Sequence, residues 1–525
     1  CQKGRTMQTI PLLFRKSVER FGARPALIEP SEGNQVSILT YQDLQERVFS
    51  FAGYLQEQQF AKGERVIIWS PSRIDWLVAY LGALLIGLVV VPLDVNSKED
   101  FLLRIAETTE AKFLVTTSKQ YQSLREPTLP LLDLDALPSG SLDMQKLPDI
   151  QKDDLAELVF TSGTTGQPKG VMLSHGNITS NVTASLAVIN VRATDRALSI
   201  LPLSHMFEMT IEMALLAAGA SIVYARTLAP DTIMKLFVSQ QITVMVLVPQ
   251  ALQLFMNAIE REVRRQKRER QWALLHRFAA RVPFAARRYL FGSVHKRFGG
   301  RFRFFVSGGA YLPLQLGRYW EEMGFRVIQG YGATECSPVI TANPMHDHDL
   351  ESVGCPLPDI EVRIAADNEI LVHGPNVAQG YWKNPEATAL SFKDGWYYTG
   401  DLGTLNARQH LYLKGRKKNL IVLSNGLNVY PEDIENILQE FPAVKEAVVI
   451  GLTEDGAGPV VHAVLLLDDP EQAKSVIQQV NKRLASHQQI KGFTLWPDQD
   501  FPRTHTLKVK RQDVLTRLPT IRQKK

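Results

Sequence analysis

A ten-residue segment rich in glycine and hydroxyl side chains, residues 161–170, could bind phosphate. It reads TSGTTGQPKG and follows the apolar run 158–160. Glycines let backbone N–H groups approach a phosphate closely, the hydroxyls add donors, and Lys169 adds positive charge. The segment does not match the Walker pattern, because Gly170 stands where a Ser or Thr should follow Lys169. Alone, the segment indicates either a different kind of phosphate loop or a plain Gly/Thr-rich turn.

Six further segments follow in a fixed order. They are LPLSHMF (201–207), SGGA (307–310), GYGATE (330–335), YTGD (398–401), GRKKN (415–419) and PRTHTLK (502–508). Together with the first segment they resemble the signatures of the acyl-adenylate-forming (AMP-binding) enzymes, a superfamily that contains acyl-CoA synthetases, luciferases and peptide-synthetase adenylation domains. The resemblance covers about residues 8 to 515. It is strongest toward the medium- and long-chain fatty acyl-CoA synthetases.

The resemblance implies a site for ATP and Mg²⁺. Thr161 and Glu335 match the positions that hold the metal, and a hydroxyl with a carboxylate suits the hard Mg²⁺ ion. The other residues that match nucleotide-binding positions are Ser162, Gly163, Thr164, Thr165, Gly166 and Lys169 for the phosphates, Thr334 for the α-phosphate, Gly309, Ala310, Tyr331 and Gly332 for adenine, and Asp401 and Arg416 for the ribose.

Lys508 is the predicted catalytic lysine. Forming an acyl-adenylate brings a carboxylate and the α-phosphate together, and an ammonium at that point stabilises the transition state. Lys491 and Lys510 are nearby competitors, but the Thr-x-Thr-x-Lys register favours Lys508, although Leu507 departs from the family's usual glycine. The resemblance further implies a mobile carboxy-terminal domain that rotates about the hinge residue Lys418. In its second pose Gly426 would let the pantetheine of CoA pass close to the backbone.

The acyl pocket is expected beside His205 and Phe207, which match a motif of that pocket. Residues 244–256 and 336–340 should line it. These segments are apolar and lack the Asp that amino-acid adenylation domains use to hold an amine. An apolar tunnel suits an alkyl chain, because each buried CH₂ contributes roughly 0.8 kcal/mol. We therefore expect a fatty acid.

Strands and helices alternate along the first third of the chain, which predicts an α/β fold with parallel βαβ layers. Expected elements include an amphipathic helix over 41–55, strands at 66–69 and 113–115, a helix from a capping box at Ser97 and Asp100, and a surface connection over 126–149. The uncharged run 76–93 is better explained by a buried helix and strand than by a membrane span. We expect a large domain over 8–414 with a β-barrel-like subdomain, and a small α+β domain over 415–525.

The composition excludes several classes of protein. Hydrophobic residues make up 45% and charged residues 22%, which is typical of a globular protein and not of a disordered one. Three cysteines, far apart, exclude a disulfide framework and a four-ligand zinc site. No apolar signal-peptide core follows the basic start, so we expect a cytoplasmic protein.

The net charge of +5 is unevenly distributed. Residues 261–303 contain fourteen Lys or Arg and two Glu, a local charge of +12, so the remaining chain carries −7. Aromatic and apolar residues lie among these cations. The segment is either a peripheral membrane surface, on the inner face of the membrane, or a solvated helical insertion; nucleic acid is not an expected partner.

Three functional classes remain. The first is an acid–thiol ligase that joins a fatty acid to CoA. The second loads an acyl carrier protein or stops at the fatty acyl-AMP. The third is a homologue that binds ligands without catalysis, which the complete set Thr161, Glu335, Asp401, Arg416 and Lys508 argues against. The sequence does not separate the first two, because both share every adenylation residue.

Overall fold

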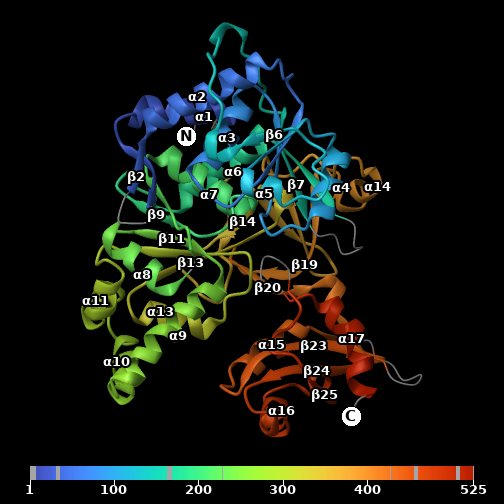
Figure 1. Ribbon diagram of the computed structural model, residues 1–525. Coiled ribbons are helices and arrows are strands. Elements are labelled where there is room, and N and C mark those ends of the chain that lie inside the picture. Colours follow the sequence, from blue (N-terminus) through green and yellow to red (C-terminus); the bar gives the residue numbers. More distant parts are fainter. Residues whose placement is uncertain are drawn as a thin grey trace. The chain divides into compact units, whose positions relative to one another are not determined.

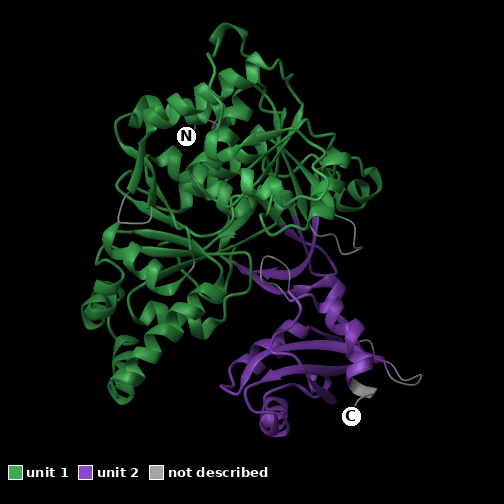
Figure 2. Ribbon diagram, in the orientation of Figure 1, with its two compact units in different colours: residues 1–362, 372–397, 408–410 green, residues 363–371, 398–407, 411–525 purple. Residues whose placement is uncertain are grey.

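The computed structural model describes residues 8–30, 36–161, 168–227, 229–425, 427–453, 459–503 and 509–523. The chain divides into two compact units (Figures 1 and 2). Unit 1 comprises residues 1–362, 372–397 and 408–410, and unit 2 comprises residues 363–371, 398–407 and 411–525. The predicted α/β class, with a large amino-terminal and a small carboxy-terminal part, is confirmed. The limit at 414/415 stays a prediction.

The first sheet of unit 1 is built from βαβ units. Its strand order is β6 (Leu131–Asp133), β5 (Phe113–Thr116), β3 (Arg65–Trp69), β4 (Val89–Leu93), β7 (Leu155–Thr161) and β8 (Lys169–Ser174). The pairs are parallel except β7 with β8, which form an antiparallel hairpin. The helices along this part of the chain are α2 (Tyr41–Glu57), α3 (Ile74–Leu85), α4 (Glu99–Thr109) and α5 (Ser118–Gln122).

The local predictions in this region are mostly confirmed. In α2 the predicted apolar positions are buried, and the side chains of Thr40 and Asp43 form a capping box at its start. The run 76–93 is the buried helix α3 followed by the buried strand β4. No helix in the described part of the chain has the length and apolar character that a membrane span requires. The capping box predicted at Ser97 is wrong, because Lys98 is the N-cap of α4 and makes no side-chain cap bond.

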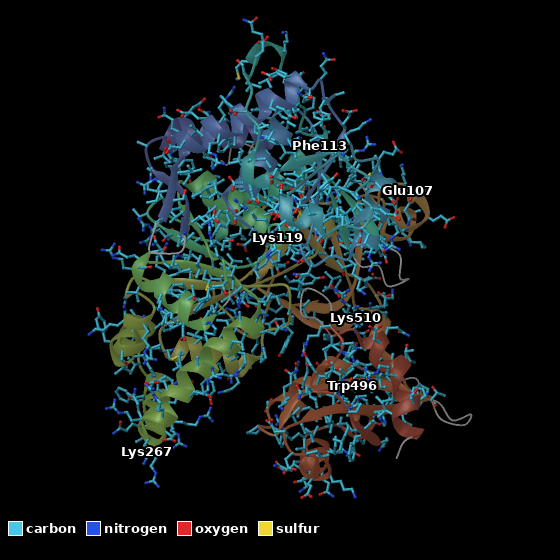
Figure 3. All side chains as sticks on the ribbon, viewed as in Figure 1. Glu107, Phe113, Lys119, Lys267, Trp496 and Lys510 are labelled. Carbon is cyan, nitrogen blue, oxygen red and sulfur yellow. The ribbon has the colours of Figure 1, made fainter. Side chains whose placement is uncertain are left out.

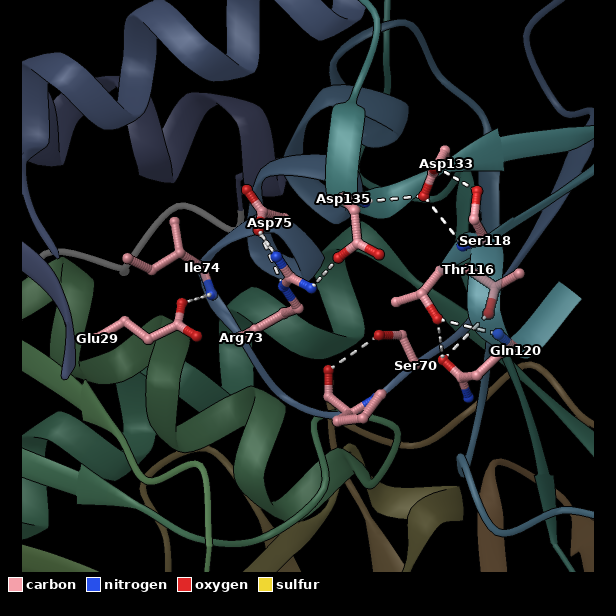
Figure 4. Close-up of polar contacts among 12 residues, drawn as sticks. Glu29, Ser70, Arg73, Ile74, Asp75, Thr116, Ser118, Gln120, Asp133 and Asp135 are labelled. Carbon is pink, nitrogen blue, oxygen red and sulfur yellow. Dashed lines mark hydrogen bonds and ion pairs between the residues drawn. The ribbon is translucent and has the colours of Figure 1, made fainter. Parts of the chain in front are cut away.

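The stretch 126–149 is more than a surface connection, because it contributes β6 to the sheet. Asp133 accepts hydrogen bonds from the backbone N–H and the hydroxyl of Ser118, at 3.1 and 2.6 Å. Asp135 forms an ion pair with Arg73 at 2.6 Å, and Arg73 also pairs with Asp75 (Figure 4). A three-residue strand held by contacts with distant residues leaves little local pattern, which explains why the sequence did not reveal it.

The second sheet of unit 1 is larger. Its order is β15 (Cys355–Pro356), β14 (Val339–Ala342), β13 (Arg326–Gly332), β12 (Phe304–Ser307), β11 (Val244–Leu247), β9 (Arg196–Ser199), β10 (Ser221–Tyr224), β1 (Pro25–Pro30) and β2 (Val36–Thr40). The helices of this part of unit 1 are α1 (Ile10–Phe21), α6 (His175–Val188), α7 (Met206–Ala218), α8 (Pro230–Ser239), α9 (Pro249–Arg265), α10 (Glu269–Ala279), α11 (Phe284–Leu290), α12 (Gly292–Arg297) and α13 (Leu314–Glu322). A further helix, α14 (Pro385–Ser391), lies later in the chain.

Side chains on the two faces of this sheet enter different cores. Val244 and Val246 belong to the core that includes α6 and α7. Met245 and Leu247 belong to the core that includes α8, α9 and α13. Successive residues of a strand point to opposite faces, so β11 contributes to both cores.

A third sheet has the order β16 (Glu361–Ile364), β17 (Glu369–His373), β19 (Trp396–Leu405) and β18 (Phe392–Lys393), with β20 (Leu411–Arg416) paired to β19. The rest of unit 2 is an α+β body made of β21 (Ile421–Val422), β22 (Asn428–Val429), α15 (Pro431–Gln439), β23 (Val444–Leu452), β24 (Val460–Leu467), α16 (Ala473–Asn481), β25 (Gly492–Leu495) and α17 (Arg511–Gln523). Its core comes from α15, α16 and the sheet β23-β24-β25.

Candidate active site

The hairpin β7–β8 presents the two ends of the predicted phosphate loop. Thr161 is paired with Lys169 in the antiparallel register, so the first and last polar residues of the motif lie side by side. The predicted phosphate-binding residues between them lie outside the described residues, and these are Ser162, Gly163, Thr164, Thr165 and Gly166. Both ends of the loop are therefore fixed by a regular β-ladder.

Tyr381 links the phosphate hairpin to Glu335. The N–H of Met172 donates to the Gly380 carbonyl at 3.0 Å, and the N–H of Trp382 donates to the Gly170 carbonyl at 2.7 Å, which fixes residues 380–382 against β8. The ammonium of Lys169 then lies 4.9 Å from the centre of the Tyr381 ring. The Tyr381 hydroxyl donates to Glu335 Oε1 at 2.9 Å.

This arrangement brings a cation, a phenol and a carboxylate into successive contact beside Lys169, the first residue of β8. Burial, and then the charge of Glu335, raises the pKa of Tyr381, so the phenol stays protonated and remains a donor. A hydrogen bond of this kind orients the carboxylate, as supporting residues do at metal sites. The sequence analysis missed Tyr381, because a tyrosine 46 residues after Glu335 carries no local signal.

The segment that contains Tyr331 and Thr334 is held in a tight turn between β13 and β14. A Cβ at Gly332 would lie 1.8 Å from the Pro338 carbonyl oxygen, so a side chain cannot be placed there. The Ala333 N–H donates to the same oxygen at 2.9 Å. The amide of Asn376 donates to the Cys336 carbonyl at 2.8 Å, which anchors the other end of the turn. The predicted residues Tyr331, Gly332 and Thr334 thus share one rigid segment with Glu335.

Gly309 and Ala310 follow the carboxyl end of β12, next to the strand that leads to Tyr331. Ser307 is paired with Gln329 in the parallel register of β12 and β13. Ligands of open α/β sheets bind beyond the carboxyl ends of such strands. Gly309 has φ +76°, which favours glycine at that position.

His205 and Phe207 lie at the start of α7. His205 is the N-cap residue, and its Nε2 lies 3.6 Å from Oδ2 of the buried Asp94, which follows β4. The ring of Phe207 approaches Gly308 so closely that a Cβ there would lie 2.9 Å from Cζ. Phe207 is thereby tied to the turn that carries Gly309. Asp94 is a second residue that the sequence analysis did not identify.

In unit 2, Asp401 and Arg416 form an ion pair. They are register partners in β19 and β20, and Arg416 Nε lies 2.8 Å from Asp401 Oδ1. The Asp401 N–H donates to the Thr399 hydroxyl at 3.0 Å. Gly415 has φ +143°, a backbone conformation that strains any other residue, and a Cβ there would lie 2.5 Å from the Glu432 carboxylate.

Lys418 lies in a short 3₁₀ turn, Lys417–Asn419, directly after β20. Burial, and then the charge of Arg416, lowers the pKa of Lys418. Its neighbour Lys417 is held by Asp367 at 2.6 Å and Glu369 at 2.8 Å. Two other predicted residues of this part of the chain, Gly426 and Lys508, lie outside the described residues.

Unit 1 also contains a small apolar cavity of about 20 Å³. It begins one helical turn beyond Phe207 and lies between α6, α7 and the strands β11 and β12. Its lining residues are Ser185, Leu186, Ile189, Val191, Ile211, Ala214, Leu215, Val244, Val246, Phe304 and Val306. Ser185 is the one residue in this lining that carries a side-chain hydroxyl.

The cavity includes part of the predicted pocket lining. Of the expected segment 244–256, Val244 and Val246 face the cavity. Leu247, Leu252, Phe255 and Met256 pack into the core on the opposite face of the sheet. The sequence did not indicate the contributions of α6, α7 and β12, because residues from four separated segments meet only in the folded chain.

Comparison with known proteins decides the family. A model of the AMP-binding enzyme family matches residues 14–382, and a model of the AMP-binding enzyme C-terminal domain matches residues 433–508. The chain belongs to the AMP-binding enzyme family. The family predicted from the ordered motifs is confirmed, and the protein is an enzyme of the AMP-forming acid–CoA ligase type.

Members of this family with different substrates resemble the chain to a similar degree. A long-chain-fatty-acid–CoA ligase, FadD15 of Mycobacterium bovis, is 28% identical over 523 residues and 86% of each chain. A feruloyl-CoA synthase of Amycolatopsis sp. is 29% identical over 448 residues, with 82% of this chain and 84% of that protein covered.

Solved structures of o-succinylbenzoate CoA synthetase (MenE) from Bacillus subtilis share 27% identity with the chain. The complex with its acyl-adenylate has a TM-score of 0.78 and covers 97% of this chain and 98% of that one. The complex with ATP and magnesium ion has a TM-score of 0.77 and covers 97% and 100%. The fold and the coarse reaction type are therefore shared among enzymes that act on different acids.

Proposed function

We propose that this protein activates a fatty acid to its acyl-adenylate with ATP and transfers the acyl group to the thiol of CoA. The apolar lining of the cavity in unit 1 is the observation that carries this proposal, and the cavity of about 20 Å³ would have to widen to admit an alkyl chain. Among the described residues, its lining is aliphatic and aromatic apart from Ser185 and includes no charged side chain. An alkyl chain suits such a lining, because each buried CH₂ contributes roughly 0.8 kcal/mol. The likeness to a long-chain-fatty-acid–CoA ligase supports the same choice.

The nucleotide roles follow from the resemblance, and the geometry of unit 1 fits them. Thr161 and Glu335 would hold Mg²⁺, which would neutralise phosphate charge when bound. The donor set is hard oxygen, and the Tyr381 hydroxyl orients the Glu335 carboxylate. Lys169 would bind the phosphates together with residues 162–166. Tyr331, Gly332, Gly309 and Ala310 would surround adenine, and Thr334 would contact the α-phosphate.

In unit 2, Asp401 and Arg416 would bind the ribose hydroxyls. Their ion pair holds a carboxylate and a guanidinium side by side, which suits two neighbouring hydroxyl groups. Lys508 would stabilise the charge that develops when the acyl-adenylate forms. Lys418 would act as the hinge for the second half-reaction, with Gly426 close to the pantetheine. His205 would lie at the entrance to the acyl pocket, with its Nε2 3.6 Å from Asp94 Oδ2.

Product analysis tests the reaction. Purified protein with ATP, Mg²⁺, CoA and fatty acids from octanoate to stearate should release AMP and pyrophosphate. ADP with inorganic phosphate would refute an adenylate mechanism. Ferulate and o-succinylbenzoate belong in the same assay, because relatives act on those acids. Higher kcat/KM with either of them than with any fatty acid would refute the proposed substrate class. Parallel assays with CoA, pantetheine and an acyl carrier protein separate the proposed acceptor from the carrier-protein alternative.

A further inference from the structure

The basic segment 261–303 folds into helices on the outside of unit 1. It includes the end of α9 and all of α10, α11 and α12. In the view of Figure 1 these helices lie along the lower left edge of unit 1, and Figure 3 places Lys267, in the turn between α9 and α10, at the end of that edge. The concentration of positive charge found in the sequence therefore lies on a protruding surface.

One face of α10 is fixed against unit 1. Burial is greatest at His276 and Ala279. His276 Nδ1 lies 2.6 Å from Glu322 Oε2, and Trp272 packs edge-on against Phe291 with ring centres 5.4 Å apart. These contacts determine which side of the helix points outward.

The outward face combines apolar and cationic side chains. Leu274 and Phe278 are 63% and 57% exposed, and a spacing of four residues places them next to each other on a helix. Arg270, Arg277 and Arg281 are exposed around them. An apolar pair among arginines is typical of a helix that lies in the interface of a membrane, with its cations among the headgroups.

The charge of this face is not neutralised by the protein. In the described part of the chain, the ion pairs of α9–α12 use Glu262 with Arg265 and Arg297, and His276 with Glu322. None of those described pairs includes Arg270, Arg277 or Arg281. Glu269 is the acidic residue of α10 itself and lies in its first turn, so it offsets part of the charge at that end.

We infer that the outer face of α10 and of the turn that follows it, defined as Arg270, Leu274, Arg277, Phe278 and Arg281, binds an anionic lipid surface. Charge complementarity selects an anionic partner, and the exposed Leu274 and Phe278 favour lipid over nucleic acid or an acidic protein. Phosphates of a nucleic acid would contact the arginines but leave both apolar side chains in water. In a bilayer, the headgroups meet the arginines while the apolar pair enters the acyl boundary. The inference goes beyond the proposed reaction and does not depend on it.

Vesicle sedimentation tests the inference with the full chain. Phosphatidylcholine vesicles that contain phosphatidylglycerol should bind the protein, pure phosphatidylcholine vesicles should bind it weakly, and salt should reduce binding. The triple variant Arg270→Gln, Arg277→Gln, Arg281→Gln should bind anionic vesicles about 100-fold more weakly at low salt, because each cation near the surface contributes about fivefold. The unmodified protein should keep part of its vesicle binding in high salt, and the double variant Leu274→Ser, Phe278→Ser should lose that part.

Control variants show whether the loss of vesicle binding is specific to the outer face of α10. Lys16→Gln, Lys119→Gln, Arg125→Gln removes three exposed cations elsewhere in unit 1, and Leu390→Ser removes an apolar side chain that is 71% exposed. Both controls should bind vesicles as the unmodified protein does. The circular dichroism spectrum and the midpoint of thermal unfolding should be equal in all variants, which shows that they are folded whatever the outcome with lipid.

Three results would overturn the inference. These are equal binding to neutral and anionic vesicles, unchanged binding by the triple Gln variant, and unchanged binding by the double Ser variant. Displacement of the protein from vesicles by a single-stranded oligonucleotide or an acyl carrier protein, with equal affinity in the unmodified and double Ser proteins, would assign the surface to that partner instead.

Discussion

Filling the apolar cavity of unit 1 should shorten the acyl chain that the enzyme accepts. Ala214 lies on α7 in the cavity wall and is 4% exposed. The variant Ala214→Phe places an aromatic ring in the space where we propose that the distal part of a long chain binds. The ring is larger than this cavity of about 20 Å³, so overpacking should cost about 1–3 kcal/mol of stability. Circular dichroism and the midpoint of thermal unfolding of the purified variant show whether it folds.

The magnitude follows from the methylene groups that the ring displaces. If Phe excludes about four methylenes at about 0.8 kcal/mol each, a long chain loses about 3 kcal/mol of binding. That loss corresponds to about 150-fold in affinity. A short chain that does not reach Ala214 loses nothing. The ratio of kcat/KM for palmitate to that for octanoate should fall by about 100-fold, mainly through KM for palmitate.

Pyrophosphate release with each acid measures this ratio. Ala217→Phe is the matched control, because Ala217 lies on the same helix, is half-buried and does not line the cavity. It should leave the ratio unchanged. An unchanged ratio in a folded Ala214→Phe protein would refute the assignment of the cavity to the acyl chain, even if the adenylate reaction itself were established.

Four further predictions concern the active-site residues and stability. Tyr381→Phe removes the hydroxyl that orients Glu335, so adenylation at limiting Mg²⁺ should fall about tenfold and recover in excess Mg²⁺; an unchanged Mg²⁺ titration would contradict that role. Lys508→Ala should slow pyrophosphate release about 10²–10³-fold and spare thioester formation from synthetic acyl-AMP. Lys418→Pro should spare acyl-AMP formation and slow transfer of the acyl group to CoA, because proline restricts the hinge. Equal damage to both half-reactions in both variants would refute the two roles. Burial raises the pKa of Glu157 from 4.5 to about 7, so its carboxyl in the folded state keeps a proton that the unfolded chain releases. The free energy of unfolding should therefore fall by about 3 kcal/mol as the pH rises through that window. In urea titrations Glu157→Gln should lack this fall, and an equal pH dependence in both proteins would contradict the prediction.

The sequence alone determined the family and much of the secondary structure. Motifs are short and contiguous, so they can be recognised before the chain folds, and ordered agreement of seven segments identified the AMP-binding enzymes. Helix α2 and the strands β3 and β4 were predictable because a buried face imposes a local period on the sequence. Helix α15 also begins with a local signal, a proline at its first position.

Errors arose where local signals competed with distant contacts. Ser97 offered a plausible cap, yet α4 begins after Lys98. The strand β6 was missed because its pairing with β5 and the bonds of Asp133 involve residues about fifteen positions away.

Only the tertiary structure decided how the site is assembled. Tyr381 reaches Glu335 because backbone bonds fix residues 380–382 to β8, and no spacing in the sequence encodes that approach. The cavity takes its walls from α6, α7, β11 and β12, which lie up to about 120 residues apart. Chemical identity is carried by residue types along the chain, whereas contacts, enclosed volumes and exposed faces depend on which distant segments pack together. The sequence therefore specified the chemistry, and the fold specified the space in which a substrate can bind.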